Sequence, residues 1–475
     1  MAESIPLCVD MDGTLLRTDT LLESILVLLK RSPLALLQLP FWVLRGRATF
    51  KQEITRRAPL NAASLPLSPE LVAHLRVEHQ AGRRLLLVTG ADKEIGLVVG
   101  EHLGLFEEVL GSNGTINLSG RHKAEFLVER FGKRGFDYAG NAPVDLAVWA
   151  EARKAIVVNG DQGLVRKAES VCEVDKVFPP PAAGLKTWLA ALRVHQWTKN
   201  LLIFVPLLGA HQWSNIPKFG AAALAFLAFS VCSSSVYLLN DLFDLEADRH
   251  HPTKRRRPFA SGHLPVLSGM IAAPVLLAIS ILIALALPLG FGITFAAYYI
   301  LTFLYSLRLK QLELIDVLSL AALYSLRVLA GGYAAQVAVS DWLLVFSIFI
   351  FLSLAFVKRF TELQQVQRDN SFSIKGRGYR VSDLELISTM GVGSGYLAVL
   401  VLALYVTNPL VTELYRRPAA LWLACPVLLY WISRVWLLAH RGLLHEDPIV
   451  FALKDKQSWL VCLLLLIVGA VAVPK

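Results

Sequence analysis

The sequence predicts a multidomain protein in which an N-terminal α/β, Rossmann-like domain with a helical cap precedes an all-α membrane domain of nine transmembrane helices. Two observations support this expectation. The mean hydropathy is +0.52 and only 18% of the 475 residues are charged, whereas soluble proteins carry roughly a quarter. The apolar excess is also uneven, because residues 1–178 mix charged and apolar residues and most long apolar runs follow Pro179–Pro181.

A proline-rich stretch, FPPPAAG (178–184), marks the boundary between the two parts, since proline and glycine punctuate linkers. We therefore expect an α/β domain over 1–178 with its cap over about 21–75, a linker over 179–186 and a membrane domain over 187–475. The five cysteines are scattered without CxxC spacing, which indicates buried thiols in a reducing compartment. The N-terminus has no basic-then-apolar signal, so we expect the first domain in the cytoplasm.

Four segments of the first domain carry a specific pattern. They are IPLCVDMDGTLL (5–16), RRLLLVTG (83–90), GRHKAEFL (120–127) and FDYAGNAPVDLAVW (136–149). The first is an apolar strand that ends in DxDGT. In this order the segments resemble the haloacid dehalogenase (HAD) superfamily, on a branch similar to phosphoserine phosphatase, in which close relatives often have Asp where this chain has Asn141.

The HAD resemblance implies a role for each of five residues. Asp10 would be the nucleophile that forms an aspartyl-phosphate, and Asp12 the general acid/base. Thr89 and Lys123 would stabilise the transferring phosphoryl group. Asp145 would bind Mg²⁺ together with Asp10 and the backbone carbonyl of Asp12. The alternative is a non-catalytic domain that keeps the fold.

Residues 21–60 form the insertion where such enzymes carry a helical cap. Pro33 and Pro40 interrupt its apolar run, so we expect no membrane span there. Four basic residues accompany the run: Lys30, Arg31, Arg45 and Arg47. This composition favours an interfacial helical pair lying on the membrane, and an ordinary packed cap is the alternative.

The second part of the chain contains nine candidate spans of about 20 apolar residues. They centre near 201–213, 218–239, 267–287, 291–307, 315–337, 342–357, 386–407, 419–438 and 458–473. With a cytoplasmic start, sixteen Lys/Arg fall in the inner connections and four on the opposite side, which is a strong positive-inside bias. We expect a multi-pass protein of the inner (cytoplasmic) membrane, with the HAD domain and both active sites on the cytoplasmic side. The net charge of +10 follows this topology, and no basic stripe with exposed aromatics points to nucleic acid.

The connection YLLNDLFDLEADRHHPTKRRRPFASG (237–262) gathers charges of both signs after the second span. Its oxygen-bearing side chains are Asn240, Asp241, Asp244 and Asp248. Three of them are spaced i, i+4, i+8, so a continued helix places them on one face with Asp241 beside them. Oxygen ligands on one face suit Mg²⁺ shared with substrate phosphates, which Lys254 and Arg257 could also contact. The alternative is a solvated loop that follows the positive-inside rule.

NDxxDxxxD followed by HPTKRRRPFASG resembles the first acidic motif of the UbiA superfamily of intramembrane prenyltransferases, over roughly residues 185–475. Family members bind a prenyl diphosphate through Mg²⁺ at two acidic motifs, after the second and sixth spans. The second motif departs here, because AFVKRFTEL offers Lys358, Arg359 and only Glu362. A Lys–Arg pair would neutralise a phosphate directly.

In this departure the chain resembles the decaprenyl-phosphate phosphoribosyltransferase branch. Two further segments support the same resemblance, LRVHQWTKNLLIFVPLL and YSLRLKQLELIDVLSLAALYSLRVLAGG. The resemblance implies phosphoribosyl diphosphate as donor and polyprenyl phosphate as acceptor, with membrane lipids around them. The HAD domain would then remove the 5-phosphate of the product. One alternative is a prenyltransferase that moves a polyprenyl chain from its diphosphate to an aromatic or other acceptor. Another is a lipid-phosphate transporter or scaffold with an inactive phosphatase.

Further cations and a tyrosine are candidates for substrate contacts. They are Lys199, Tyr305, Arg308 and Arg327. An Arg in mid-span usually faces a polar cavity, and the alternative for Arg327 is pairing with a helix carbonyl or Asp316. Lys199 could instead be an interfacial anchor beside Trp197, and Arg308 could snorkel from a helix end. Glu446 and Asp447 could touch substrate or the soluble domain, and the sequence is compatible with a homo-oligomer.

Overall fold

The computed structural model describes most of the 475 residues. The residues outside its description are 1–4, 114–116, 369–376, 409–414, 445–447 and 473–475. Contacts divide the chain into two compact units, of which unit 1 is Met1–Leu192 with Tyr237–Pro274 and unit 2 is Arg193–Val236 with Val275–Lys475. The acidic connection after the second predicted span therefore belongs to the same unit as the α/β domain. The domain boundaries drawn from the sequence stay predictions.

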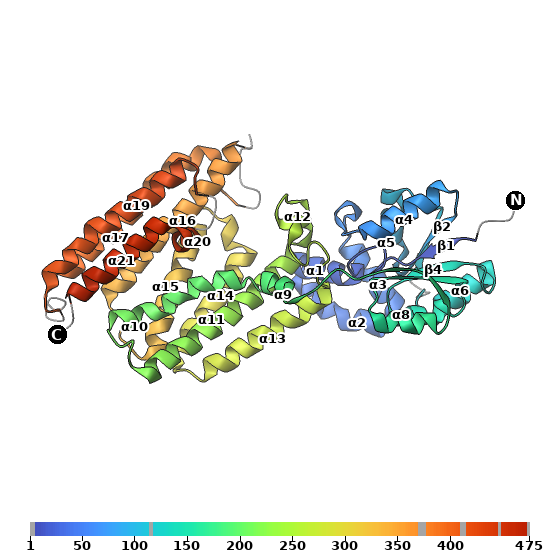
Figure 1. Ribbon diagram of the computed structural model, residues 1–475, viewed down its shortest axis with the longest axis horizontal. Coiled ribbons are helices and arrows are strands. Elements are labelled where there is room, and N and C mark those ends of the chain that lie inside the picture. The colour runs from blue at the N-terminus through green and yellow to red at the C-terminus, as the bar shows by residue number, and fades with distance from the viewer. Residues whose placement is uncertain (1–4, 114–116, 369–376, 409–414, 445–447, 473–475) are drawn as a thin grey trace. The chain divides into compact units, whose positions relative to one another are not determined.

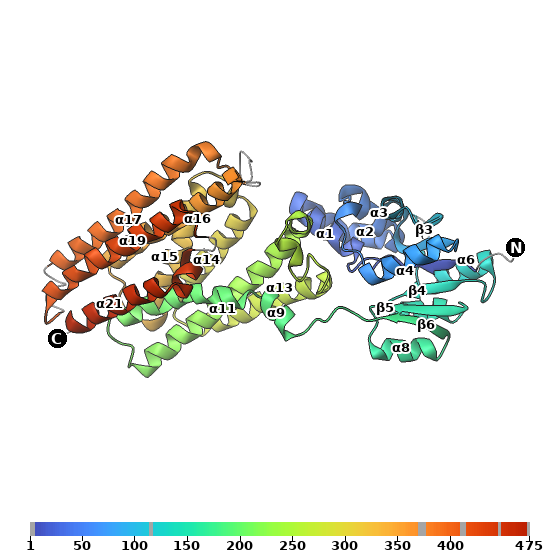
Figure 2. The same cartoon turned by 45° about the horizontal axis from the view of Figure 1, so that its top comes forward.

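Unit 1 is built on a six-stranded parallel sheet of order β3-β2-β1-β4-β5-β6, whose neighbours β4, β5 and β6 are seen in Figure 2. The strands are β1 Leu7–Val9, β2 Leu85–Asp92, β3 Glu108–Ser112, β4 Asp137–Gly140, β5 Lys154–Val158 and β6 Glu173–Phe178. Leu7 and Val9 join the core on one face of the sheet and Cys8 joins the core on the other. Burial on both faces explains why β1 and most of β2 and β5 read as continuous apolar runs. The predicted α/β fold is confirmed.

Helices cover the sheet and form the cap of unit 1. They are α1 Thr20–Arg31, η1 Pro33–Gln38, α2 Leu39–Leu44, α3 Arg47–Arg57, η2 Ala62–Ser64, α4 Pro69–Gln80, α5 Lys93–Leu103, α6 Arg121–Phe131, η3 Pro143–Asp145, α7 Leu146–Trp149, α8 Gln162–Glu169, α9 Leu185–Ala191, α12 Leu245–His250 and η5 Lys254–Arg256. In the cap, Leu28, Trp42 and Ile54 make a small core of their own. The strand order changes direction at β1, so the carboxyl ends of β1, β2 and β4 meet where ligands bind in such sheets.

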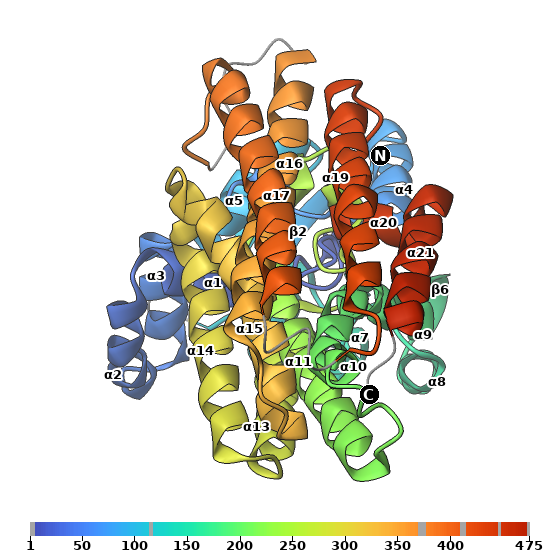
Figure 3. The same ribbon diagram turned by 90° about the vertical axis from the view of Figure 1, so that its left-hand side faces the viewer.

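Unit 2 is helical, and α11 Ile216–Phe243 and α13 Val266–Leu285 contribute residues to both units. Its other elements are η4 Val194–Phe204, α10 Val205–Gly209, α14 Leu289–Leu307, η6 Leu309–Gln311, α15 Ile315–Ala335, α16 Asp341–Arg368, η7 Val381–Asp383, α17 Leu384–Thr407, η8 Pro418–Leu423, α19 Ala424–His440, α20 Pro448–Lys454 and α21 Lys456–Ala472. Helices that are neighbours in the chain pack side by side, as α16 and α17 do (Figure 1). Figure 3 shows α21 beside α19.

Seven helical segments in the described part of the chain are long and apolar enough to cross a membrane. They are Ile216–Phe243, Val266–Leu285, Leu289–Leu307, Ile315–Ala335, Asp341–Arg368, Val381–Thr407 and Pro418–His440. These match seven of the predicted spans, and the chain is an integral membrane protein. The segment predicted as the first span is a 3₁₀ stretch and the short α10, because Pro206 lacks the amide hydrogen that a continuing helix needs. The last is the 17-residue α21, so the count of nine stays a prediction.

Candidate active sites

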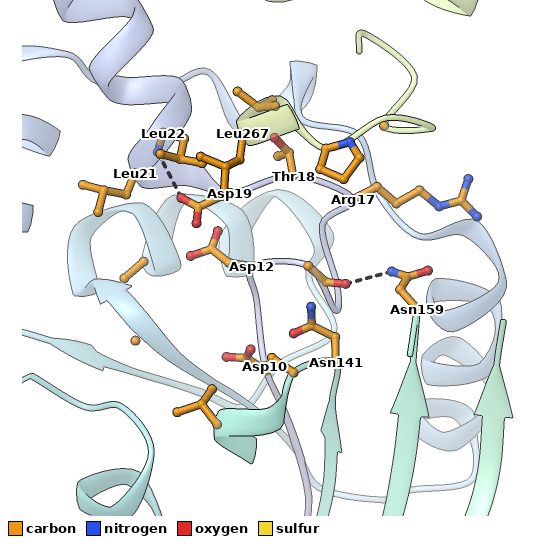
Figure 4. A pocket seen from close by; sticks show the side chains of 18 of the residues that line it. Asp10, Asp12, Arg17, Thr18, Asp19, Leu21, Leu22, Asn141, Asn159 and Leu267 are labelled. Carbon is orange, nitrogen blue, oxygen red and sulfur yellow. Dashed lines mark hydrogen bonds between the residues drawn. The ribbon is translucent and has the colours of Figure 1, made fainter. Parts of the chain in front are cut away.

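A pocket of about 620 Å³ lies at the carboxyl ends of the central strands of unit 1 (Figure 4). Asp10 and Asp12 follow β1 and line the pocket. Asn159 donates a hydrogen bond to the Gly13 carbonyl at 2.7 Å, which holds the turn after these carboxylates. The wall also includes Gly262 of the acidic connection, whose φ of +73° and contact with the chain leave no room for a side chain.

Lys123 links the predicted nucleophile Asp10 to the predicted metal ligand Asp145 through a buried chain of hydrogen bonds. Its Nζ donates to Asp10 Oδ1 at 2.7 Å, to the Tyr138 hydroxyl at 2.8 Å and to the Val88 carbonyl at 3.1 Å. The Tyr138 hydroxyl donates in turn to Asp145 Oδ1 at 3.1 Å. Lys123 is only 3% exposed, so water competes little with its ion pair to Asp10.

Asp145 is already bonded to protein donors through both carboxylate oxygens. Its Oδ2 accepts the backbone N–H groups of Asn141 and Ala142, each at 3.0 Å, while its Oδ1 accepts the Tyr138 hydroxyl. Burial and the negative charge of Asp10 raise the pKa of Asp145 to about 6. Asp145 and Asn141 both line the pocket with Asp10, and Figure 4 shows Asn141 beside Asp10. The predicted role of Asp145 as a metal ligand stays a prediction, and its hydrogen bonds also shape the loop.

Asp12 has the environment of a proton donor. Its carboxylate accepts the Thr20 backbone N–H at 2.9 Å and the Thr20 hydroxyl at 3.3 Å. Burial is the main cause that raises the pKa of Asp12 to about 7, with the charges of Asp19 and Asp10 adding to it. A carboxyl group that keeps its proton near neutral pH can act as a general acid.

Thr89 has a different place from the one the sequence indicated. It is fully buried within β2, and its hydroxyl accepts the Ala91 backbone N–H at 3.0 Å. Gly90 and Ala91 line the pocket in its stead. The sequence missed Lys51 of the cap, which also lines the pocket and donates to the Gly90 carbonyl at 2.6 Å. No local motif could have revealed Lys51, whereas Tyr138 stands in the strand before Asn141 and could have been found there.

The acidic connection keeps helical spacing but is not one continuous helix. α11 ends at Phe243, Asp244 interrupts with φ −106° and ψ 15°, and α12 begins at Leu245. The hydrogen bonds continue across the break, since Asp244 N–H reaches the Asn240 carbonyl at 3.0 Å and Asp248 N–H reaches the Asp244 carbonyl at 2.8 Å. Helical hydrogen bonds therefore continue through Asp244, while the expectation that Asn240, Asp244 and Asp248 share one face stays a prediction.

Arg257 lies between two buried carboxylates of this connection. Its Nη1 donates to Asp241 Oδ1 at 3.2 Å and to Asp248 Oδ2 at 2.6 Å. Two carboxylate oxygens that reach one cationic atom also suit a divalent ion that keeps several waters and shares substrate oxygens. Within the described ranges, no group of three or more His, Cys, Asp or Glu is arranged to hold a metal. A Mg²⁺ site here would thus depend on water and substrate ligands.

Other charges of the same connection turn toward the cap. Asp244 pairs with Lys30 of α1, whose Nζ lies 2.8 Å from Asp244 Oδ1 and 2.8 Å from the Phe243 carbonyl oxygen. Asn240 is half-buried and Lys254 is exposed. Of the predicted metal ligands, Asp241 and Asp248 therefore contact Arg257, and Asp244 contacts the cap.

Asp316 is the centre of a buried charged cluster in unit 2. It forms an ion pair with Arg359 Nε at 2.6 Å, accepts the Tyr305 hydroxyl at 2.8 Å and lies 3.2 Å from Arg377 Nη1. Arg359 also pairs with Glu362. The cluster thus brings together three predicted residues and adds Asp316 and Arg377, which the sequence did not assign to the site.

The charge of Arg359 is balanced inside this cluster. Its side chain is fully buried and two carboxylates contact it, so it does not offer the direct phosphate contact expected from the sequence. Lys358, the next residue, is half-buried.

Arg327 lies in a polar network inside the helical bundle. It donates to Asn200 Oδ1 at 2.8 Å, to the Leu323 carbonyl at 2.6 Å and to the Tyr298 hydroxyl at 2.9 Å. The bond to the Leu323 carbonyl is the helix-carbonyl pairing that was the alternative expected for Arg327, and two side chains add to it. Asp316 is not a partner of Arg327 in these hydrogen bonds.

The remaining candidates of unit 2 are spread out. Lys199 is buried, and its Nζ lies 6.0 Å from the centre of the Tyr324 ring. Trp197 donates to Ser234 at 3.0 Å, and Arg308 is exposed at the end of α14. Glu446 and Asp447 lie outside the described residues.

The chain belongs to the UbiA prenyltransferase family, whose sequence model matches residues 201–454. A Sinorhizobium fredii protein named y4nM is 39% identical over 460 residues, which cover 96% of this chain and 89% of that protein. Nodulation protein NoeC of Azorhizobium caulinodans is 38% identical over 288 residues, 60% of this chain and 92% of its own. Decaprenyl-phosphate phosphoribosyltransferase of Mycolicibacterium smegmatis is 32% identical over 225 residues, 46% of this chain and 70% of its own.

Solved structures are similar to each part. A UbiA homologue from Archaeoglobus fulgidus, bound to DMAPP and Mg²⁺, covers 59% of this chain and 98% of its own at 17% identity and a TM-score of 0.46. A probable phosphoserine phosphatase from Vibrio cholerae, in unliganded form, covers 35% of this chain and 60% of its own at 16% identity and a TM-score of 0.27. The parallel sheet and the pocket that joins Asp10, Asp12 and Lys123 agree with the HAD resemblance of the N-terminal domain.

Proposed function

We propose that the membrane part transfers 5-phosphoribose from phosphoribosyl diphosphate to polyprenyl phosphate, and that the HAD domain then hydrolyses the 5-phosphate of the product. The observation that supports the transfer is the convergence of the buried carboxylates Asp241 and Asp248 on one cationic atom of Arg257. The similarity to decaprenyl-phosphate phosphoribosyltransferases supports the choice of substrates. Transfer leaves a phosphomonoester, which is the substrate class that a fused phosphatase needs.

In the transfer, an oxygen of the acceptor phosphate attacks the anomeric carbon of the donor while the bond from that carbon to pyrophosphate breaks. Asp241 and Asp248 would hold a Mg²⁺, which supplies positive charge to the leaving pyrophosphate. Arg257 would then turn from these carboxylates to the diphosphate, as a guanidinium fork suits phosphate oxygens. Lys254, exposed on the same connection, adds a second cation.

The acceptor is an anion and needs a cation near it more than a general base. We assign this role to Lys358, a half-buried cation that precedes Arg359 in α16. Arg359 is then a positioning residue that ties α15 to α16. Lys199 and Arg327, which both lie over the Tyr324 ring, remain candidates for the polar wall of the site.

In the hydrolysis, Asp10 attacks phosphorus and the bond from phosphorus to the ribose oxygen breaks. Asp12 gives its proton to that leaving oxygen, and water then cleaves the aspartyl-phosphate to inorganic phosphate. Lys123 offsets charge on the phosphoryl oxygens beside Asp10. Hard oxygen donors of Asp10 and Asn141 line one pocket and fit Mg²⁺, which supplies further positive charge there when bound.

The test incubates the purified full chain with magnesium and one of two substrate pairs. Phosphoribosyl diphosphate with polyprenyl phosphate should yield pyrophosphate and ribosylated lipid. Product only from prenyl diphosphate with 4-hydroxybenzoate would replace the proposal by prenyl transfer, which the family name allows. The Asp10→Asn variant should accumulate 5-phosphorylated lipid, and equal phosphate release from variant and wild type would contradict the hydrolytic step.

A further inference from the structure

The part of the cap over residues 34–44, here called the cap tip, exposes an unusual run of large apolar side chains. They are Leu34 (79% exposed), Leu37 (79%), Phe41 (59%), Val43 (53%) and Leu44 (85%). Single exposed apolar residues are common on protein surfaces, but a dense group marks an interaction site. The tip is folded nonetheless, because Trp42 turns inward and is only 4% exposed against Leu28 and Ile54.

The cap tip begins close to the end of a membrane span. Lys30 of α1 contacts the carbonyl of Phe243, the last residue of the span α11, at 2.8 Å. A buried ion pair of Glu23 with Arg249 fastens the same helix to α12. The four residues from Lys30 to Leu34 extend over at most about 14 Å. The tip therefore begins four residues after a lysine that contacts the last residue of α11.

Basic residues stand at both ends of the cap tip. Arg31 precedes it and Arg45 follows it, and both side chains are exposed. The Arg45 guanidinium lies 5.4 Å from the centre of the Phe41 ring, so charge and apolar surface are adjacent. An apolar patch bordered by Arg fits the surface of a bilayer with anionic lipids, where the negative surface charge attracts basic residues.

We propose that the cap tip inserts into the surface of the bilayer that α11 crosses, as an additional, interfacial membrane anchor. The occupant is the lipid surface because the tip starts beside the end of a span and carries basic flanks. This inference does not depend on the proposed reaction. One consequence does depend on that reaction. The pocket of unit 1 is lined by Leu22 of α1 and by Val266 and Leu267, the first residues of the span α13. With the tip in the bilayer, this pocket would receive a phosphate carried by a lipid.

The test uses the full-length protein in nanodiscs of phosphatidylcholine and phosphatidylglycerol. Exposed Cys462 and half-buried Cys425 are replaced by serine, and an environment-sensitive fluorophore is attached to a cysteine in place of Leu37. The matched control carries the label in place of Val77, which is also apolar and 62% exposed but belongs to α4. Nitroxide lipids labelled at the head group should quench the label at 37 several-fold more than the label at 77. Removing phosphatidylglycerol should weaken this quenching.

Equal quenching at the two positions would overturn the proposal. A label at position 37 that is shielded from water without lipid quenching would also overturn it, in favour of a second copy on the patch. A second variant guards against an effect of the label itself. With the label at Leu44, the double change Leu37→Glu and Phe41→Glu should reduce quenching several-fold while the thermal midpoint stays unchanged. Unaltered quenching in that variant would count against the anchor.

Discussion

Arg249 of α12 donates to both carboxylate oxygens of Glu23 in α1, at 2.8 and 2.6 Å, and the two side chains are only 6% and 5% exposed. Glu23 also accepts the hydroxyl of Thr18, which lines the HAD pocket. Arg249 follows Asp248 of the acidic connection in the chain. One buried ion pair thus joins the structural support of the HAD pocket to the connection proposed to hold a diphosphate.

Glu23→Gln should strongly destabilise unit 1, because it leaves the Arg249 charge buried without its counter-ion. Breaking such a pair costs about 3–5 kcal/mol. The thermal midpoint in detergent measures the loss. The control is Glu107→Gln, which removes a pair with Arg84 that is exposed on both sides and should cost at most about 1 kcal/mol. Equal shifts in the two variants would show that the Glu23 pair adds no particular stability.

Tyr138→Phe should lower hydrolysis of a phosphomonoester by about tenfold. The change removes the hydroxyl that joins Lys123 to Asp145 but keeps the ring, so it costs on the order of one charged hydrogen bond. Hydrolysis of p-nitrophenyl phosphate by the full chain measures kcat. Trp149→Phe, which removes a buried hydrogen bond to the Tyr138 carbonyl on the far side of the chain, is the matched control and should keep kcat. Unchanged kcat in Tyr138→Phe would remove this residue from the site.

Hydrolysis of the phosphomonoester should fall as pH rises through about 7. Burial and neighbouring carboxylates raise the pKa of Asp12 to about 7, so its proton-bearing form is present below that value and is lost above it. Above this pH the fraction of Asp12 that carries a proton to donate falls tenfold for each pH unit. The measurement is kcat against pH for wild type and Asp12→Asn, with the variant expected to be slow and without this limb. A wild-type rate that stays level to pH 9 would speak against Asp12 as the acid.

Asp241→Ala and Asp248→Ala should each lower transfer on the order of 100-fold, because each removes a proposed oxygen ligand. A chelator should abolish transfer by wild type, and added Mg²⁺ should restore it. Asp175→Ala, which changes an exposed acid on β6, is the control. Release of pyrophosphate gives the rate. Full activity in either loop variant, or indifference to the chelator, would refute the magnesium site.

Much of the fold could be predicted from local patterns. The DxDGT turn after an apolar strand indicated the HAD pocket, and Asp10, Asp12 and Lys123 do meet there. Seven spans followed from apolar length alone. The segment 201–213 was misread as a regular helix because composition does not register the break near Pro206.

Partners distant in the chain were beyond such patterns. No sequence pattern near Asp316 indicates that Arg359 and Arg377 neutralise its charge. No pattern near Lys51 indicates that this residue lines a pocket. Even near neighbours could escape the patterns, because the hydrogen bonds of Asp145 to Tyr138 and to the backbone amides of Asn141 and Ala142 were not predicted.

The sequence by itself indicated the strands that precede Asp10 and Thr89 and seven of the spans, since periodicity and apolar length depend only on neighbours in the chain. The tertiary structure alone decided where each charge is balanced, because a buried ion is stabilised by whichever counter-ion the folded chain brings within about 4 Å. For this reason Asp244 faces Lys30 and Asp248 faces Arg257, although the two acids stand one helical turn apart.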